Sequence, residues 1–597
     1  MPTISTHRRH LLLSLLALLI AAAAISSHAD DLALWPDEIF SVVHARGSLE
    51  QIIIDRDLNW PAGYFLLLHG WGNVASFHDF SLHWLGALLG LLTTALLIRT
   101  GRELLDPLAG WLIGVAFATS SYTLTFILEL RGYTLMFLTI ALFLLCYLRW
   151  LKHDSRWRRV WLVIAGAAML YTHFILWFVL VATTAHLIVS KPRKLLTWLL
   201  LLIASFVIAA PLIPQFILSF QVRGMFGGTL PGYFFFPLET QFRAYSAQED
   251  WLFGGIVLLT VIGIATALIS RKLSWQTILW LGGWGVLIPI LAYLLRERLT
   301  LWTTRYLTFT AIPVFILIGV GVASLRWQAL RLIGAAGVIV LAAVPWKPYD
   351  HRPAETDGFP PLQEFMRYVA TELQLGDEVI IDPRCSCQGS QITWSYYESL
   401  YLPMKKLPIT THPDYSVRRL WYITRQGSET PQLLNRIQNG RIQRSFWGPW
   451  YFAVTLWELP PDPEGLVFGD SGIRFMGADI DRQVEIYGGD TVSVMLWWQA
   501  AQPLADLYSF SLQLRDSQGR VIVQSDGVPT PLSSWIPEQL VLDQRTLTIP
   551  YGLASGRMTL HLLAYRWEDG VRLTPQGTST DSILLDRLRY FTFNAGS

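Results

Sequence analysis

Residues 11–38 read LLLSLLALLIAAAAISSHADDLALWPDE, and this stretch decides the class of the protein. Its first part, 11–27, is an apolar run of a length that crosses a bilayer, for which about 20 residues are needed. An acidic pair, Asp37-Glu38, follows it. Arg8-Arg9, the apolar run and Ser27-His28-Ala29 also match a cleaved signal peptide. We expect the run to stay as the first span, because cleavage would leave the acidic pair on a free tail.

The composition is that of a membrane protein with a soluble part. Of 597 residues, 52% are hydrophobic and 15% are charged, whereas soluble globular proteins have about 25% charged residues. The apolar runs are confined to 11–346, and 347–597 reads as soluble protein. The net charge of +2 says nothing about nucleic acid, but the sequence has no basic stripe with interleaved aromatic residues, so we expect no nucleic-acid partner. We expect a transmembrane domain (1–346), an α/β domain (347–460) and a β-sandwich domain (461–597).

About eleven segments are apolar enough to be membrane spans. They are residues 11–27, 82–99, 107–126, 132–150, 159–172, 174–189, 195–215, 252–270, 275–295, 306–325 and 330–346. The stretch 159–189 is ambiguous, because it reads as one long helix, two short helices or a broken helix. Counting it as one span would place the C-terminal part on the other side of the membrane.

The distribution of Arg and Lys orients the spans, because cytoplasmic loops carry an excess of both. With eleven spans and the N-terminus inside, sixteen lie in inner loops: Arg8, Arg9, Arg99, Arg102, Arg149, Lys152, Arg156, Arg158, Arg159, Lys191, Arg193, Lys194, Arg271, Lys272, Arg326 and Arg331. Eight lie in outer loops up to residue 346: Arg46, Arg56, Arg131, Arg223, Arg243, Arg296, Arg298 and Arg305. We expect a multi-pass protein of a bacterial-type cytoplasmic membrane, with a cytoplasmic N-terminus and extracytoplasmic C-terminal domains.

Under this topology the unusual polar residues share the outer side. They are Asp37, Glu38, Asn59 and Trp60 of the first outer loop, Glu129, Arg131 and Tyr133 of the next outer turn, His173 after the fifth span, and Arg305 beside the tenth. Ionisable residues at membrane depth are costly and mark functional sites. Residues 61–76 are too short to span but apolar and aromatic, so we expect them to lie in the interface plane, flanking a cavity beside Asp37.

These residues also have structural interpretations. The acidic pair after Pro36 fits the start of a surface helix, where Asp is favoured. Glu129 and Arg131 fit partners that neutralise other charges, and His173 fits a hydrogen-bonded core histidine. Arg305 fits a side chain that snorkels to the interface. Their joint placement on one side favours a functional cluster.

Four short motifs carry a resemblance to a known family. They are the acidic pair Asp37-Glu38, an E-x-R-x-Y (Glu129 to Tyr133), a Y-T-H (Tyr171 to His173) and an R-Y-L (Arg305 to Leu307). In this order they resemble the glycosyltransferase family 39 group, membrane enzymes such as the dolichyl-phosphate-mannose-protein mannosyltransferases, with the C-type glycosyltransferase fold. The resemblance covers about residues 1–350 and includes the run Gly101 to Pro107. It implies a sugar on a polyprenyl phosphate as donor and a protein, lipid or glycan acceptor outside the cytoplasmic membrane.

The resemblance also implies roles for single residues. Asp37 is expected to act as the base that takes the acceptor proton, with Glu38 as its catalytic partner or support. Arg131 and Arg305 are expected to bind the donor phosphate, because guanidinium is planar and permanently charged. The remaining candidates are His173 and Tyr133 for the phosphate, and Asn59, Trp60 and Glu129 for the acceptor or for structural support. No cofactor and no metal site are expected, and a divalent cation is left open.

Two departures from the family pattern put the acceptor in doubt. Many relatives carry H-P-P where this chain has Trp60-Pro61-Ala62, and His83 stands where an Arg is often found. A catalytically inactive, glycan-binding relative is therefore one alternative. A transporter or flippase of lipid-linked glycans is another, although transporters carry their polar sites near the midplane and here the charges gather at the outer ends of spans.

The C-terminal part reads as two further units. A helical pattern at 365–373 and strands at 378–381, 420–423 and 452–457 predict a small α/β unit, and no G-x-G-x-x-G follows its strands. After residue 460, short runs alternate between apolar and polar residues, which is typical of a β-sandwich. We expect it to act as a spacer or docking module.

The three cysteines differ in their surroundings. Cys146 lies in an apolar span. Cys385 and Cys387 form a C-x-C in the soluble part, which fits two free thiols, a disulfide or a pair of metal ligands.

Overall fold

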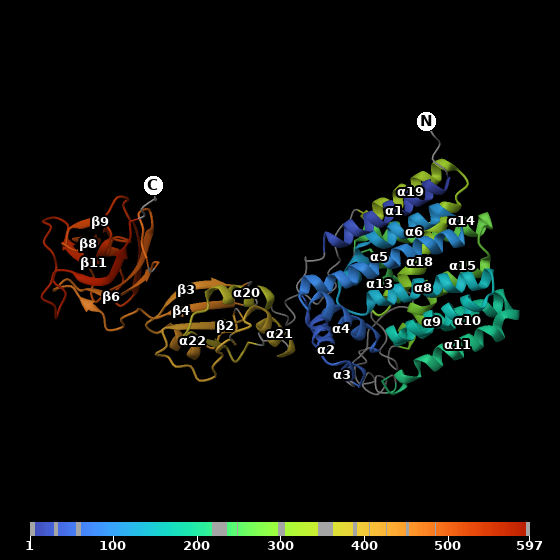
Figure 1. The fold of residues 1–597 in the computed structure, drawn as a ribbon, viewed down its shortest axis with the longest axis horizontal. Coiled ribbons are helices and arrows are strands. Elements are labelled where there is room, and N and C mark those ends of the chain that lie inside the picture. Colours follow the sequence, from blue (N-terminus) through green and yellow to red (C-terminus); the bar gives the residue numbers. More distant parts are fainter. Residues whose placement is uncertain are drawn as a thin grey trace. The chain divides into compact units, whose positions relative to one another are not determined.

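A computed structural model of the chain describes most of the sequence and divides it into two units, Met1–Arg352 and Pro353–Ser597 (Figure 1). The described residues are 6–28, 34–54, 61–215, 217, 236–246, 249–295, 305–343, 362–385, 391–404, 406–425, 427–448, 453–483 and 485–592.

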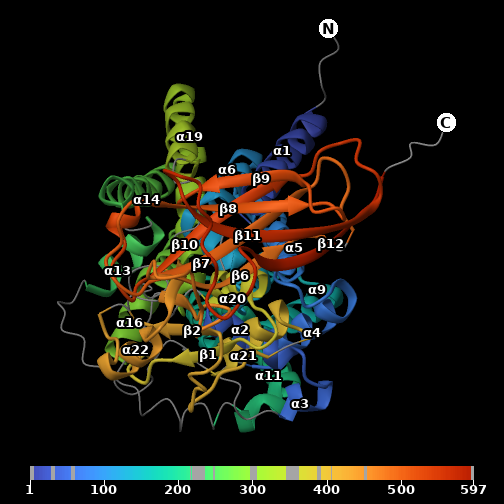
Figure 2. The same ribbon diagram turned by 90° about the vertical axis from the view of Figure 1, so that its left-hand side faces the viewer.

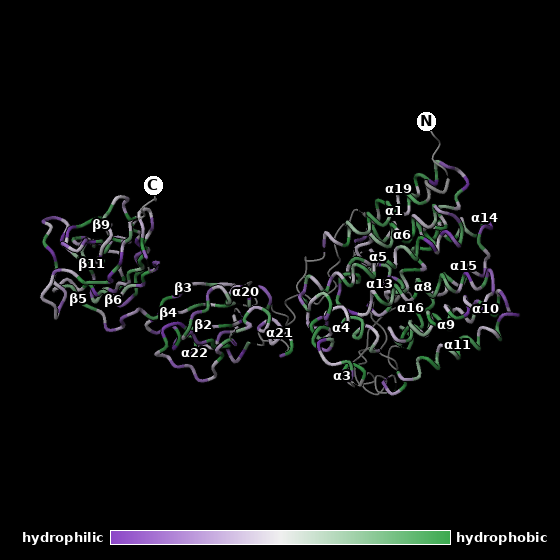
Figure 3. Tube along the Cα trace, in the orientation of Figure 1, coloured by the Kyte–Doolittle hydropathy of each residue, from purple (hydrophilic) through white to green (hydrophobic). Residues whose placement is uncertain are grey.

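Apolar helices make up the first unit, and each of the eleven predicted spans coincides with one helix or with a series of helices. They are α1 (Thr6–Ser26), α5 (Asp79–Leu104), α6 (Pro107–Thr119), α7 (Ser121–Leu128), α8 (Tyr133–Lys152), α9 (Arg156–Thr172), η1 (Phe174–Leu176), α10 (Trp177–Ser190), η2 (Pro192–Lys194), α11 (Leu195–Ala209), η3 (Ala210–Leu212), α14 (Asp250–Ser270), α15 (Trp275–Gly282), η4 (Gly283–Leu287), α16 (Ile288–Leu294), η5 (Thr308–Thr310), α18 (Ala311–Ser324) and α19 (Gln328–Ala343). Hydrophobic residues run along these helices (Figure 3).

The length of these helices decides how many can cross a membrane. Among the described residues, five are long and apolar enough, or six if α6 and α7 form one bent span. Further apolar helices, including Phe174–Ser190 and Thr308–Ser324, are shorter. The chain is therefore a multi-pass membrane protein by its helices, and the number of about eleven spans stays a prediction.

Two breaks in the helices shape the site described below. α6 and α7 meet at an angle of 63°, because Ser120 between them has an extended backbone. His173 is also extended and separates α9 from η1 and α10. The ambiguous stretch 159–189 is thus broken at His173 and forms two helices.

Small residues let the helices pack closely. A Cβ atom on Gly321 of α18 would lie 2.0 Å from the Cα of Gly263 on α14, so the two backbones meet at this pair. Thr266 of α14 donates a hydrogen bond to the carbonyl of Gly321 at 3.0 Å. Close backbone contact through glycine is the usual way in which membrane helices associate.

Within the described part of the first unit, four helices lie outside the predicted spans: α2 (Pro36–Ala45), α3 (Leu49–Ile54), α4 (Gly63–Ala75) and α13 (Phe236–Tyr245). α4 corresponds to the predicted interfacial segment 61–76, and it packs against α2, α5 and α9. Gly63 permits this packing, because a Cβ atom there would lie 2.4 Å from the carbonyl oxygen of Tyr171.

The second unit begins with one mixed sheet. Its strand order is β1 (Glu378–Ile381), β2 (Arg419–Thr424), β4 (Ala453–Glu458), β3 (Ile442–Trp447). β1 and β2 are parallel and the other neighbours are antiparallel. The helices around it are α20 (Leu362–Glu372), α21 (Gln391–Tyr401) and α22 (Pro431–Gln438). The predicted strands at 378–381, 420–423 and 452–457 correspond to β1, β2 and β4.

Two antiparallel sheets complete the second unit (Figure 2). One has the order β10 (Leu540–Thr548), β7 (Thr491–Ala500), β6 (Ile473–Asp481), β5 (Leu466–Val467), and the other β12 (Ile583–Tyr590), β11 (Gly556–Arg566), β8 (Tyr508–Arg515), β9 (Val521–Gly527). Both contribute to one hydrophobic core, in which Trp498 packs on Phe510 with ring centroids 3.9 Å apart. The sandwich interpretation and its boundary after residue 460 stay predictions.

Candidate functional site

The first turn of α2 presents the acidic pair. Pro36 begins the helix, and Asp37 and Glu38 follow at its amino end, where negative charge is favoured by the helix dipole. Glu38 turns back into the protein: its Oε2 accepts a hydrogen bond from the backbone N–H of Trp35 at 3.0 Å. Its Oε1 accepts one from the backbone N–H of Leu130 at 2.8 Å. Only 5% of Glu38 is exposed, so this carboxylate joins α2 to the turn after α7.

The turn after α7 also contacts α2 through the side chain of Arg131. Arg131 extends from this turn to α2, where its Nη1 donates to the backbone carbonyl of Asp37 at 3.1 Å and to the hydroxyl of Ser41 at 3.2 Å. Arg131 is 6% exposed. Together with Glu38, it forms a two-way connection that fixes the backbone of Asp37.

Asp37 itself pairs with Arg305. The Oδ2 of Asp37 lies 2.9 Å from Nη1 of Arg305, and the side chains are 35% and 30% exposed. The guanidinium also lies over two rings, 5.4 Å from the centroid of Trp35 and 5.7 Å from that of Tyr306. Arg–aromatic contacts of this kind hold a guanidinium while leaving its edge open.

Two further candidates lie deeper. Glu129, at the end of α7, is 6% exposed. Burial raises its pKa well above the ordinary value, the Glu38 carboxylate adds to the rise, and the charge of Arg131 opposes it. Tyr133 is fully buried and lies edge-on to Phe126 at 5.0 Å, within electrostatic reach of Glu129, Arg131 and Arg305.

His173 occupies the break between α9 and η1. Its Nδ1 accepts a hydrogen bond from the backbone N–H of Ile175 at 3.0 Å, so the neutral ring carries its proton on Nε2. The ring is 1% exposed and lies 5.6 Å from the ring of Tyr306. His173 therefore reaches the site through Tyr306, the residue next to Arg305.

A polar network supports the turn that carries Arg305. Gln241 of α13 donates to the hydroxyl of Tyr122 at 3.0 Å and to the carbonyl of Leu307 at 3.4 Å. Tyr245 of α13 and Thr310 share a hydrogen bond of 2.5 Å between their hydroxyls. The segment after Arg305 is thus held by α7 and α13.

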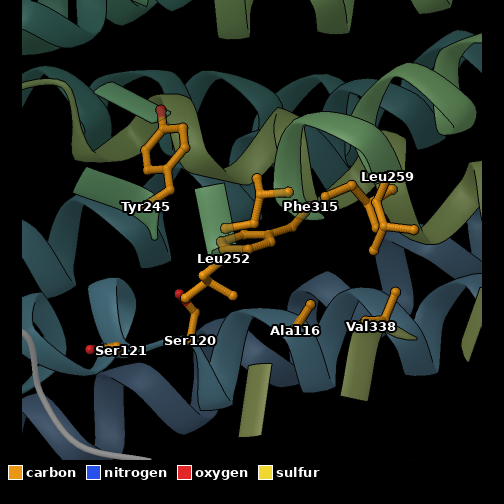
Figure 4. Close-up of a pocket in the computed structure, with 10 residues that line it drawn as sticks. Ala116, Ser120, Ser121, Tyr245, Leu252, Leu259, Phe315 and Val338 are labelled. Atoms are coloured by element: carbon orange, nitrogen blue, oxygen red, sulfur yellow. The ribbon is translucent and has the colours of Figure 1, made fainter. Parts of the chain in front are cut away.

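A small pocket lies beside this network (Figure 4). Its apolar lining comes from α6, α14, α18 and α19, and includes Leu252, Leu259 and Phe315. Ser120, Ser121 and Tyr245 supply its polar groups. The hydrogen bond between the hydroxyls of Tyr245 and Thr310 connects this pocket to the Arg305 segment.

Comparison with known proteins finds structural similarity at low sequence identity. No protein-family model and no curated protein matches it. Among solved structures it is similar to ArnT from Cupriavidus metallidurans bound to undecaprenyl phosphate, with a TM-score of 0.48, 13% identity, and 76% of this chain and 98% of that chain covered. It is also similar to the archaeal oligosaccharyltransferase AglB from Archaeoglobus fulgidus in complex with an inhibitory peptide and a dolichol-phosphate, with a TM-score of 0.42, 10% identity, and coverage of 93% and 97%.

The structure brings most of the sequence-predicted residues together. Asp37, Glu38, Glu129, Arg131, Tyr133 and Arg305 form one cluster, and His173 borders it through Tyr306. Asn59 and Trp60 lie outside the described residues. Among the residues that the structure describes, no three His, Cys, Asp or Glu side chains gather as a metal site would require.

Sequence reasoning missed the residues that hold the cluster in place. Trp35 stacks on Arg305, and Ser41 accepts from Arg131. Ser41 lies one helical turn beyond Asp37, so a helix predicted from Pro36 would have placed it on the same face. Gln241 and Tyr245 carry no comparable signal, because their partners are distant in the sequence.

Proposed function

We propose that this chain is a membrane glycosyltransferase that moves a sugar, a hexose or a pentose, from a polyprenyl phosphate to an acceptor hydroxyl on the extracytoplasmic face. The observation that carries the proposal is the ion pair of Asp37 and Arg305, a carboxylate and a guanidinium 2.9 Å apart and both partly exposed. A transfer to a hydroxyl with departure of a phosphate needs one group of each kind.

The chemistry follows from these two groups. The carboxylate of Asp37 takes the proton of the acceptor hydroxyl while its oxygen forms a bond to the anomeric carbon of the sugar. The bond from that carbon to the phosphate oxygen breaks, and its electron pair leaves with the polyprenyl phosphate. Arg305 donates to the phosphate oxygens, and its fixed charge stabilises the negative charge that gathers there.

The buried charged residues hold Asp37 in position. Glu38 accepts two backbone N–H groups and Arg131 holds the carbonyl of Asp37, so we assign them to fixing the base. Glu129, Tyr133 and His173 are buried, and we assign them to supporting the same cluster. Of the three carboxylates, that of Asp37 is the one exposed enough to contact the acceptor, whether the acceptor is a protein, a lipid or a glycan.

Two observations support an extracytoplasmic location. Sixteen Arg and Lys residues against eight favour the topology in which Asp37 and Arg305 lie outside. Cys385 is disulfide-bonded, and disulfides persist in oxidising compartments; Cys387 lies outside the described residues. Both favour a C-terminal unit outside the cytoplasm.

The test is sugar transfer by the purified full-length protein. Wild type, Asp37→Asn and Asp250→Asn are incubated with radiolabelled polyprenyl-phosphate sugars and membrane acceptors. We expect Asp37→Asn to lower the rate by about 10²- to 10⁴-fold, the usual contribution of a general base, with unchanged thermal stability. Asp250→Asn is the matched control, because Asp250 also pairs with an arginine, Arg243, at 2.7 Å but lies outside the cluster.

A second variant separates the base from its support. Glu38→Gln keeps the shape of the side chain but weakens its contacts with two backbone N–H groups, so it should lower stability by about 1–3 kcal/mol as well as the rate. Undiminished transfer by Asp37→Asn would exclude its role as base. Movement of glycolipid across vesicles without transfer would identify a transporter instead.

A further inference from the structure

The ion pair between Asp37 and Arg305 occupies the two groups that the proposed reaction needs separately. The Oδ2 of Asp37 accepts from Nη1 of Arg305 at 2.9 Å. The lone pair of Oδ2 that faces the guanidinium cannot take the proton of an acceptor while the pair is formed, so the pair removes one of the acceptor positions of this carboxylate. The Nη1 donor of the guanidinium is likewise engaged by the carboxylate.

The two side chains differ in how firmly they are held. The backbone around Asp37 is fixed by Arg131, which donates to the carbonyl of Asp37, and by Glu38, which accepts from the backbone N–H of Trp35. The segment after Arg305 is fixed through Leu307 and Thr310. Both side chains nevertheless remain about one-third exposed. A change of partner therefore requires side-chain rotation and no movement of the helices.

Arg305 is suited to exchange a carboxylate for a phosphate. Its fork of N–H donors matches the oxygens of either group. Trp35 and Tyr306 contact the guanidinium through their rings, and ring contacts do not use the in-plane N–H groups. The aromatic residues can thus keep the guanidinium at this place while its anionic partner changes.

We propose that Arg305 is shared between Asp37 and the donor phosphate, so that binding of the lipid-linked phosphate withdraws Arg305 from Asp37 and frees that carboxylate to act as the base. The proposal rests on the proposed function. The position at Oδ2 is then open to an acceptor hydroxyl when the donor is bound. After transfer, the polyprenyl phosphate monoester keeps Arg305 until it leaves, and the Asp37 pair forms again.

The exchange is tested by binding alone. The full-length protein in nanodiscs is titrated with undecaprenyl phosphate as the probe. Because Asp37 competes for Arg305, Asp37→Asn should bind the probe about two- to fivefold more tightly than wild type, the range of a partly exposed ion pair. Arg305→Ala should lose binding by about tenfold or more. In the Arg305→Ala background, Asp37→Asn should change nothing.

Matched variants exclude simpler explanations. Asp250→Asn removes the same charge from the Arg243 pair and should leave affinity unchanged. In case Arg305→Ala is unstable, Asp37→Asn is also combined with Arg305→Gln, whose side chain keeps hydrogen-bond donors. Thermal unfolding checks the stability of both Arg305 variants. If Asp37→Asn raises the affinity for the probe equally with and without Arg305, the effect is charge repulsion and the exchange is overturned. An unchanged affinity in Asp37→Asn would also overturn it.

Two further probes identify the ligand. Undecaprenol, which has the chain but no phosphate, should bind much more weakly, and equal binding would overturn phosphate recognition. Inorganic phosphate that binds as tightly as the lipid would assign the site to free phosphate and overturn the lipid donor. Sugar transfer without the expected binding pattern would overturn the exchange alone, whereas the binding pattern without transfer by any donor would overturn the proposed function.

Discussion

Three carboxylates of the site differ more in surroundings than in chemistry. Asp37 is about one-third exposed, whereas Glu38 and Glu129 are buried. Consecutive residues on a helix point about 100° apart, so Asp37 and Glu38 cannot face the same partner. One meets Arg305 and the other meets Leu130. Adjacent acidic residues in the sequence therefore have separate tasks in the structure.

The raised pKa of Glu129 gives the stability a pH dependence of defined sign. The unfolded chain has an ordinary glutamate pKa of about 4.3, and burial and Glu38 raise the folded value. Between the two values the folded state binds more protons, so stability falls as pH rises through this window. In Glu129→Gln the loss of stability with rising pH should be smaller than in wild type. Above the pKa of Glu129 in the folded state, the variant should be more stable than wild type.

The measurement is thermal unfolding of the full-length protein across the window that begins near the ordinary glutamate pKa. Glu50→Gln is the control, because Glu50 is a glutamate on the exposed surface of α3. It should keep the wild-type pH profile. If Glu129→Gln and wild type lose stability in parallel as pH rises, Glu129 is not the group responsible.

At the scale of elements, the apolar runs predict the helices and little predicts their breaks. A length of about 20 apolar residues is a strong signal, and all eleven runs coincide with helices. Ser120 and His173 interrupt helices without a nearby proline or glycine to mark the position. Their extended backbones follow from packing against other helices, which the local sequence does not contain.

The contact between α5 and α7 depends on Gly86. A Cβ atom at this position would lie 2.2 Å from the carbonyl oxygen of Ile127, two residues before Glu129. Gly86→Ala should therefore push α7 away, lower stability by about 1–3 kcal/mol as overpacking does, and reduce sugar transfer by displacing the turn that holds Glu38.

Gly254→Ala on α14 is the control, because nothing lies within 4 Å of its added Cβ atom. Alanine in a helix should be neutral or slightly stabilising there. Thermal unfolding and transfer are measured for both variants. Equal behaviour of the two would show that the α5–α7 contact tolerates a methyl group and does not position the site.

At the scale of the whole molecule, the alternation of side chains along a strand predicts which face of the sheet each residue lies on, but not which residues it contacts there. Trp497 and Trp498 are consecutive in β7, and both are buried. Trp498 lies in the core shared by the two sheets, whereas Trp497 donates to Asp479 at 2.8 Å and lies under Arg418 at 5.9 Å. The period of two predicts opposite faces, but only the fold identifies what each face meets.

The orientation of the chain in the membrane decides whether Asp37 can contact an acceptor outside the cytoplasm, and cysteine labelling tests it. Ser517 lies exposed between β8 and β9, and His153 lies exposed between α8 and α9. In intact cells, a membrane-impermeant maleimide should label Ser517→Cys, and it should label His153→Cys only after permeabilisation, since the positive loops stay inside. The unsubstituted chain, in which Cys146 is a free thiol within a span, gives the background. The reverse labelling pattern would place the C-terminal unit inside and exclude extracytoplasmic transfer.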